Sequence, residues 1–88
     1  MRYAARVDAN QAAIVEALRG AGCVVWVLGL PVDLLVGKNG RTVLVEVKTK
    51  RGKYTELQQS FMASWTGGPV ATVRDVDGAL TLARSLAD

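Results

Sequence analysis

Apolar residues recur along the chain with two spacings, one typical of helices and one typical of strands. The first helical stripe contains Ile14, Val15 and Leu18, which predicts a helix that runs to about residue 19. Asp8 is followed three residues later by Gln11, the spacing of a capping box, in which each residue satisfies a first-turn or cap N–H. We therefore expect the helix to start at this pair.

Three strand-like runs follow the first predicted helix. They span Cys23–Leu28, Val32–Val36 and Thr42–Lys48, and they are rich in β-branched residues. Asn39-Gly40 lies between the second and third runs and is the strongest short hairpin signal, because both residues tolerate a positive φ. The second and third strands are therefore predicted to be antiparallel neighbours.

A second helix is predicted after the strands. Thr55 and Gln58 have the spacing of a second capping box, and Thr66-Gly67-Gly68-Pro69 ends the segment. Three large apolar residues between these signals recur at helical spacing, and we expect them in the core or in a dimer interface rather than stacked on bases. They are Phe61, Met62 and Trp65. Trp26, in the first strand, is likewise expected to be a packing residue rather than a base-stacking one.

The last part of the chain has the pattern of a strand and a helix. Residues 70–74 form the predicted strand, and an apolar helical period runs from Val76 to Leu86 with Asp75 or Asp77 as its cap. A helix between the third and fourth strands makes a crossover, so these two strands should be parallel. The expected fold is α/β: an α-β-β-β-α-β core with a mixed four-stranded sheet, covered by helices, and an extra C-terminal helix.

Length and composition indicate one small globular domain. The chain has 88 residues, half of them hydrophobic, and residues 1–7 have no clear period, which is typical of a flexible or interface-forming arm. A domain of this size buries only about 60 to 65% of the surface of its unfolded chain. A partner subunit would add stability, so we expect a homo-oligomer, most simply a dimer.

Composition also excludes several classes of protein. The chain has no histidine and a single cysteine, Cys23, so a zinc site and an intramolecular disulfide are both excluded. No apolar run approaches the roughly 18 residues of a membrane span, and the N-terminal residues lack the apolar core of a signal peptide. We expect a cytosolic protein without a membrane partner.

Three charged residues lie on otherwise apolar strands. Strand alternation places Glu46 and Lys48 on one face, and the hairpin brings Asp33 toward Glu46. Two carboxylates held together in this way suit Mg²⁺ or Mn²⁺, and the backbone carbonyl of Val47 is a candidate third ligand. Lys48 would orient or deprotonate a water that attacks a phosphodiester. The alternative is that Glu46 and Lys48 form an ordinary surface ion pair and Asp33 only caps or turns the chain near Pro31.

The motifs resemble the PD-(D/E)xK nuclease superfamily, and within it the small phage-type VRR-NUC domains. The resemblance covers nearly the whole chain, and its core has the same α-β-β-β-α-β order. The matching segments are Pro31–Gly37, Gly40–Lys48, Tyr54-Thr55-x-x-Gln58, Trp65-x-Gly67, and the less specific Asp8–Gln11 and Val73–Leu80. It implies a metal-dependent DNA endonuclease, similar to Holliday-junction resolvases, from a phage or prophage and therefore active in the host cytosol.

The resemblance also implies roles for particular residues. Asp33 and Glu46 correspond to the metal ligands, Lys48 to the catalytic lysine, and Gln58 to a glutamine that faces the site, although Gln58 also fits the cap of its helix. Some relatives place a glutamate on the first helix as a further ligand. Here Gln11 lies at that buried-side position, where it either binds a metal-bound water or only caps the helix, while Glu16 faces away.

Basic residues cluster directly after the charged strand. Lys50, Arg51 and Lys53 follow within five residues of Lys48 with no acid among them, and Arg41 lies at the far side of the hairpin. These side chains would hold phosphates without reading bases, so selectivity for branched or structured DNA is expected. The alternative function is a catalytically weak DNA-binding or assembly subunit that retains the nuclease fold.

Overall fold

The computed structural model describes residues 9–87, so the predicted arm at 1–7 and the predicted cap Asp8 lie outside the described residues. Within this range the elements follow the predicted order α-β-β-β-α-β-α. They are α1 (Gln11–Gly20), β1 (Val24–Val27), β2 (Leu34–Lys38), β3 (Arg41–Val47), α2 (Glu56–Ser64), β4 (Val70–Val73) and α3 (Val76–Ser85). The chain is an α/β protein.

The strands form one mixed sheet in the order β1-β2-β3-β4. β1 pairs antiparallel with β2. β2 and β3 pair antiparallel, and β3 and β4 pair parallel, and both of these pairings were predicted. Lys38 pairs with Arg41 and closes a two-residue turn in which Asn39 has φ 54° and Gly40 has φ 78°. Two positive φ values are what a type I′ hairpin turn requires, and this turn sets the register of everything on β2 and β3.

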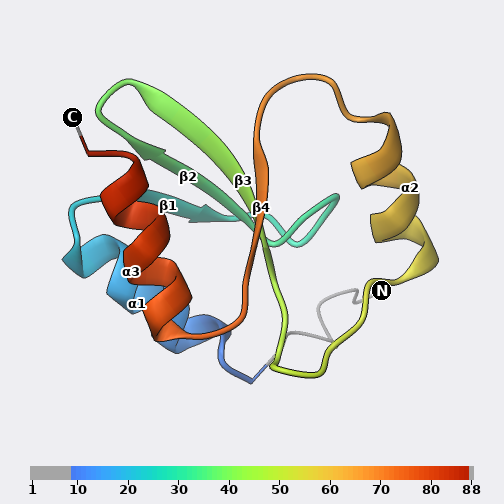
Figure 1. The fold of residues 1–88 in the computed structure, drawn as a ribbon, viewed down its shortest axis with the longest axis horizontal. Helices are drawn as coiled ribbons and strands as arrows, with labels where there is room; N and C mark the ends of the chain where they lie inside the picture. The colour runs from blue at the N-terminus through green and yellow to red at the C-terminus, as the bar shows by residue number, and fades with distance from the viewer. Residues whose placement is uncertain (1–8, 88) are drawn as a thin grey trace.

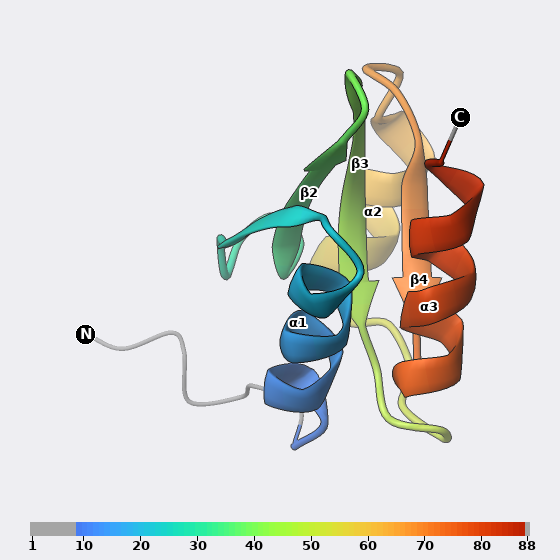
Figure 2. The same ribbon diagram turned by 90° about the vertical axis from the view of Figure 1, so that its left-hand side faces the viewer.

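The core lies between one face of the sheet and the pair α1 and α3. Val36, Val43 and Val45 point from the sheet into this layer and are buried, and Ile14 and Leu18 of α1 are fully covered. Figure 1 and Figure 2 show α1 and α3 side by side on this face. Burial of apolar side chains in this single layer is the main stabilising contribution that the fold offers.

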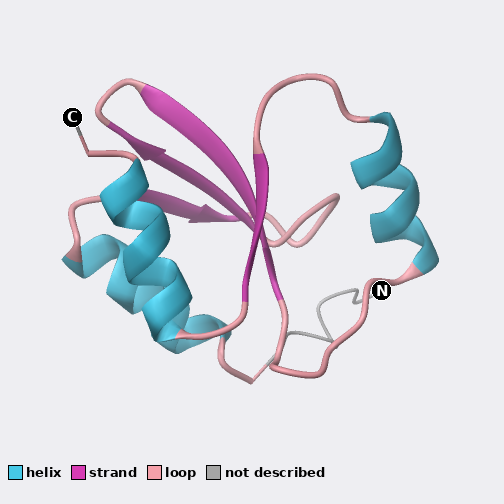
Figure 3. Cartoon of the chain, in the orientation of Figure 1, coloured by secondary structure: helices cyan, strands magenta, loops and turns pink. Residues whose placement is uncertain are grey.

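The helix α2 lies beyond the opposite face of the sheet and contributes no buried residue. Figure 3 shows that long loops connect it to β3 and β4. The predicted core role of Phe61, Met62 and Trp65 is therefore wrong within the single chain: Phe61 and Trp65 stack on one another with ring centroids 5.2 Å apart, and Trp65 is 41% exposed. Helical spacing shows which residues share a face, but not whether anything covers that face.

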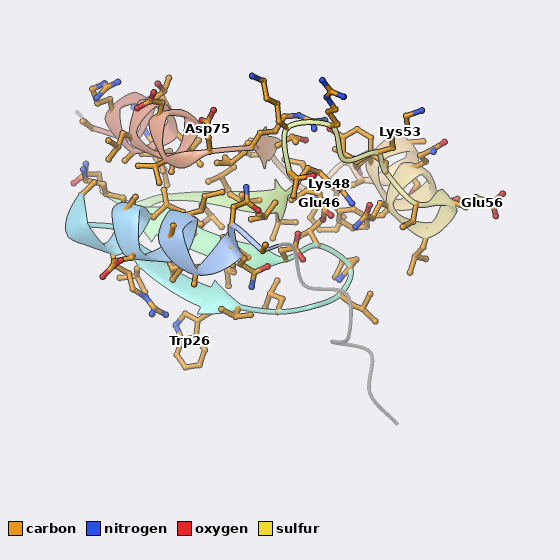
Figure 4. All side chains as sticks on the ribbon, turned by 90° about the horizontal axis from the view of Figure 1, so that it is seen from below. Trp26, Glu46, Lys48, Lys53, Glu56 and Asp75 are labelled. Atoms are coloured by element: carbon orange, nitrogen blue, oxygen red, sulfur yellow. The ribbon has the colours of Figure 1, made fainter. Side chains whose placement is uncertain are left out.

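Trp26 was also expected to pack in the core or in a dimer interface, and the core role is wrong within the single chain. It lies on the edge strand β1 and is 69% exposed, and Figure 4 shows it pointing away from the sheet. Val25 and Val27 of β1 face the side of α1, but of the four residues of this strand only Val25 is buried. A four-residue edge strand with one buried side chain explains why an apolar run does not guarantee burial.

The helix ends agree with the sequence at two sites and differ at one. Thr55 and Gln58 form the predicted capping box, and the Asp75 side chain accepts a hydrogen bond of 2.7 Å from the Gly78 N–H. At α1 the N-cap residue is Asn10, with no side-chain cap hydrogen bond, and Gln11 is the first helical residue. The predicted capping role of Gln11 is therefore wrong, because the helix begins too late for it.

Candidate metal centre

The hairpin register brings the two predicted acids to facing positions. Leu34 pairs with Val45 at the last rung of the β2–β3 ladder, so Asp33 and Glu46 are the next residues on each side. The Asp33 side chain is fixed by the backbone of β3, because the Val47 N–H donates a 2.7 Å hydrogen bond to Asp33 Oδ2. Val47 thus enters the centre through its N–H, while the ligand role of its carbonyl stays a prediction.

Glu46 is the most deeply buried charged residue among the described residues, with 1% of its surface exposed. Its Oε2 atom lies 3.5 Å from Lys48 Nζ and accepts a short hydrogen bond from Gln58 Nε2. Its Oε1 atom is buried without a hydrogen-bond partner. Figure 4 shows Glu46 and Lys48 close together beneath the loop that leads to α2. A buried carboxylate oxygen without a hydrogen-bond partner destabilises the folded state unless a ligand binds it.

The environment of Glu46 raises its pKa to about 7. Burial is the largest cause, because it penalises the charged form, and the negative charge of Asp33 raises the pKa further. The Lys48 ammonium acts in the opposite direction and offsets only part of this increase. A divalent cation bound between Asp33 and Glu46 would offset the repulsion between these two carboxyl groups.

Gln58 takes both of the roles that the sequence left open. Its Oε1 atom accepts from the Thr55 N–H at 2.9 Å as part of the capping box, and its Nε2 group donates to Glu46. The cap orients the amide so that its donor side faces β3. Gln58 therefore links the start of α2, which otherwise stands apart from the sheet, to the acid at the centre.

The start of α1 lies at the same end of the sheet. Asn10 Nδ2 donates to the Lys48 carbonyl at 3.2 Å and to the Arg74 carbonyl at 2.7 Å, so it ties α1 to the ends of β3 and β4. The next residue, Gln11, is 7% exposed, and Glu16 is on the exposed face, as predicted. Gln11 Oε1 and Asn10 Oδ1 are both buried without a hydrogen-bond partner. The sequence reasoning missed Asn10, because no residue pattern signals a side chain that bonds carbonyls of distant strands.

The donor set fits a hard divalent cation. No group of three or more acidic, histidine or cysteine side chains that could hold a metal occurs within residues 9–87, so the acidic side chains that this end of the sheet offers to a cation are the pair Asp33 and Glu46. Among the described residues, side-chain oxygens that are buried without a hydrogen-bond partner occur in Glu46, Gln11 and Asn10. Mg²⁺ and Mn²⁺ take oxygen ligands from carboxylates and side-chain amides, and Mg²⁺ retains several waters when only one or two carboxylates bind it.

Two further residues near the lysine were not predicted. Lys48 Nζ lies 5.9 Å from the centre of the Tyr54 ring, and the Tyr54 hydroxyl forms a short hydrogen bond with Thr72 Oγ1. Thr72 is the β4 residue that pairs with Glu46. The aromatic face attracts the ammonium group of Lys48 and limits where its side chain can lie. Only the position of Tyr54 next to the Thr55 cap pointed to it in the sequence.

The predicted DNA-binding residues fall into two separate places. Lys50, Arg51 and Lys53 are exposed in the loop that follows Lys48. Arg41 lies at the hairpin end of β3, roughly 16 Å of strand away from Glu46, and donates a 3.1 Å hydrogen bond to the Ser85 carbonyl. The structure therefore places the loop cations beside the centre but does not bring Arg41 to it.

Two surface depressions lie outside this centre. One, of about 610 Å³, lies between α1 and β1 and includes Gln11, and the other, of about 260 Å³, lies between the sheet and Trp65. None of the residues Asp33, Glu46, Lys48 and Gln58 lines either of them. The centre is therefore distinguished by its buried charges and by its buried oxygens without hydrogen-bond partners, and not by these two depressions.

The chain matches no protein-family model, and neither a curated protein nor a solved structure is similar to it at a significant level. The family resemblance of the sequence motifs therefore stays a prediction. None of the helices in the described part of the chain is long and apolar enough to cross a membrane.

Proposed function

We propose that the protein is a Mg²⁺- or Mn²⁺-dependent DNA endonuclease that hydrolyses phosphodiester bonds in branched or otherwise structured DNA. One observation carries the proposal: Glu46 is buried against Asp33, has an oxygen without a partner, and shares its other oxygen between Lys48 and Gln58. A surface ion pair would not be buried in this way, so the alternative of an ordinary exposed pair is the weaker explanation.

Each residue of the centre has a role in this proposal. Asp33 and Glu46 hold the cation, with Gln11 as a further oxygen donor or as a partner of a metal-bound water. When bound, the cation neutralises charge on the scissile phosphate and lowers the pKa of a coordinated water. Lys48 orients or deprotonates the attacking water and stabilises negative charge as it develops on the phosphate. Gln58 holds the Glu46 carboxylate in place through its capped amide.

The basic loop supports DNA as the substrate. Lys50, Arg51 and Lys53 are exposed directly after the centre, at a position where they would contact the phosphates that flank a scissile bond. Side chains that bind only phosphates carry no sequence information. Selectivity would therefore come from the shape of the DNA.

We also infer a homo-oligomer, most simply a dimer, that uses the exposed side of β1. Val24, Trp26 and Val27 of this edge strand are 63%, 69% and 55% exposed, and no charged residue occurs between Arg19 and Asp33. An apolar edge strand is a template for pairing with another chain, and the Arg19 guanidinium, which bonds the Val25 carbonyl at 2.7 Å, would have to release that carbonyl. Antiparallel pairing of β1 from two copies would bury this edge strand of each copy in one symmetric interface.

Cleavage of defined DNA substrates tests the proposed activity. Wild-type protein, incubated with Mn²⁺ and with duplex, flap and four-way-junction DNA, should produce cleaved strands. Lys48→Ala should reduce the rate by about 100-fold or more, because the lysine acts on the reacting groups. Lys38→Ala is the matched control, since Lys38 donates to the Ala21 carbonyl at the opposite end of β2. Equal cleavage by wild type and Lys48→Ala would remove the active-site assignment.

A second candidate function is a catalytically weak DNA-binding or assembly subunit. It is favoured by α1, which offers the amide of Gln11 rather than an acid, so that only two carboxylates are available to a cation. This candidate predicts salt-sensitive DNA binding without cleavage, together with no heat of binding when Mn²⁺ is titrated into the protein. Detectable Mn²⁺ binding by wild type that is lost in Asp33→Asn would exclude it.

A further inference from the structure

One arginine outside the proposed centre is bonded to the backbone of the basic loop. Arg74 Nη1 donates to the Thr49 carbonyl at 2.7 Å and to the Gly52 carbonyl at 3.0 Å, with a longer contact of 3.4 Å to the Lys50 carbonyl. Arg74 follows β4, so these bonds join the end of that strand to a loop more than 20 residues earlier in the chain. A cation that binds several carbonyls of one loop fixes the path of its backbone.

The loop itself is tightly turned around this side chain. The Gly52 N–H donates to the Thr49 carbonyl at 3.0 Å, and a Cβ at Gly52 would lie 3.1 Å from Thr49 Oγ1 and 3.3 Å from Thr49 N. The position therefore has little room for a side chain. The narrow turn holds the Thr49 and Gly52 carbonyls within reach of one guanidinium nitrogen.

Asn10 anchors the same segment from the other side. Its Nδ2 group bonds the carbonyl of Lys48, where the loop begins, and the carbonyl of Arg74 itself. The strand end that bears the proposed catalytic lysine and the arginine that holds the loop are thus joined through one amide. The two side chains together fix residues 48–52 relative to the sheet.

We propose that Arg74 and Asn10 form a clamp that positions the basic loop to bind the phosphate backbone of DNA. Because the loop carbonyls face Arg74, the side chains of Lys50, Arg51 and Lys53 are left exposed on the outside, beside Lys48. Arg74 Nη1 is occupied by loop carbonyls, so the part of Arg74 in this proposal is to position the loop cations. The part of the proposal that concerns DNA rests on the proposed nuclease function, whereas the clamp itself does not.

Limited trypsin digestion of the native full-length chain tests the clamp without DNA, because trypsin cuts after the three loop cations. Arg74→Ala should be cut in the loop at least about tenfold faster than wild type, since release of a loop raises its open population. Arg84→Ala removes the same charge from α3, where the Arg84 side chain donates a 3.4 Å hydrogen bond to Thr81 one turn earlier, and should be cut within about twofold of the wild-type rate. Arg74→Lys should restore most of the protection, because an ammonium can donate to the same carbonyls.

Equal loop cleavage in Arg74→Ala and Arg84→Ala would overturn the clamp. Cleavage after Lys38, in β2, reports unfolding of the whole domain. Loop cleavage without cleavage after Lys38 therefore shows that only the loop has been released. If Arg74→Ala unfolds, Asn10→Ala decides: loop cleavage faster than in wild type supports the clamp, and loop cleavage at the wild-type rate overturns it.

Binding of a labelled four-way junction in EDTA at low salt tests the consequence for DNA. Arg74→Ala should raise the Kd about tenfold more than Arg84→Ala does, although both lose one charge, because ordered cations lose less freedom on binding. Equal Kd values for the two variants would overturn the positioning role in DNA binding. No binding by wild type would remove the proposed DNA substrate, while the trypsin result would still decide the clamp.

Discussion

The two faces of the sheet meet different demands. The face under α1 and α3 is apolar except at the hairpin end, where Lys38 and Arg41 bond carbonyls at the ends of these helices, and Leu34, Val36 and Val45 are fully buried. The opposite face has apolar residues that are half open, among them Leu35 and Leu44, and at one end the buried pair Glu46 and Lys48. The first face stabilises the fold, and the second keeps charges where apolar packing would be more favourable. Such a division is typical of a protein in which a ligand-binding or catalytic site lowers the stability of the fold.

The largest difference between the two faces should appear when neighbouring leucines of β2 are truncated. Leu34→Ala should lower the free energy of unfolding by about 2 to 5 kcal/mol, because it leaves a cavity in the closed layer. Leu35→Ala, which points to the other face and is only partly buried, should cost about 1 kcal/mol or less. Urea denaturation of both variants makes the measurement. Equal losses would contradict the view that only one face carries the core.

The second largest effect concerns Glu46 and has a defined dependence on pH. In the folded state the pKa of Glu46 is raised to about 7, above its ordinary value of 4.5. The folded state therefore binds more protons than the unfolded state between these values, and the free energy of unfolding falls as pH rises from about 4.5 to 7. Without metal, Glu46→Gln should remove this fall and stabilise the protein at pH 8 by up to about 3 kcal/mol.

Thermal or urea unfolding in EDTA at pH 5 and pH 8 checks this prediction. The control is Glu16→Gln, an exposed acid on α1 that should leave the pH dependence unchanged. Addition of Mn²⁺ should restore stability to wild type but not to Glu46→Gln, because only the charged carboxylate binds the cation well. A wild-type protein that becomes more stable between pH 5 and pH 8 in EDTA would contradict the assignment.

A smaller effect should distinguish two adjacent glutamines of α2. Gln58→Ala removes both the cap of Thr55 and the donor to Glu46, so it should cost about 1 kcal/mol of stability and reduce the cleavage rate about tenfold or more. Gln59→Ala removes only a 3.1 Å bond from Nε2 to the Tyr54 carbonyl. It should leave the rate within about twofold. Steady-state cleavage and urea denaturation of both variants supply the numbers, and an equal loss of rate would show that Gln58 acts only as a cap.

The smallest effect on folding should come from Trp26, at the open edge of the sheet. Trp26→Ser should change the free energy of unfolding of the monomer by less than about 0.5 kcal/mol, because the side chain is mostly exposed. Sedimentation velocity should show that wild type is a dimer and that Trp26→Ser is shifted toward monomer. Trp65→Ser, directly after α2, serves as the control for loss of an exposed tryptophan. A monomeric wild type would remove the proposed contact at β1.

Much of the arrangement was accessible from the sequence because local patterns determined it. Strand alternation placed Glu46 and Lys48 on one face, and the Asn39-Gly40 turn set the register that brings Asp33 opposite Glu46. The Thr55 capping box likewise predicted the start of α2, and with it the orientation of the Gln58 amide. In each case the signal lies within a few residues, so no knowledge of the tertiary structure is needed.

The features that could not be predicted depend on contacts between distant segments. Periodicity showed that the apolar residues of α2 share a face, but not that the helix stands away from the sheet. The bonds of Asn10 to Lys48 and Arg74 span 38 and 64 residues and end on backbone carbonyls, which every residue possesses. No pattern of residue types identifies such partners. The same applies to Trp26, whose exposure depends on β1 being the edge of the sheet.

The most direct test of the account is a crystal of the protein soaked in Mn²⁺ and examined by anomalous diffraction. We predict one peak between the carboxylates of Asp33 and Glu46, in coordination distance of the Glu46 oxygen that lacks a hydrogen-bond partner, and its loss in Asp33→Asn. An undisturbed pair of carboxylates without anomalous density at saturating Mn²⁺ would contradict the metal centre and the nuclease function that depends on it.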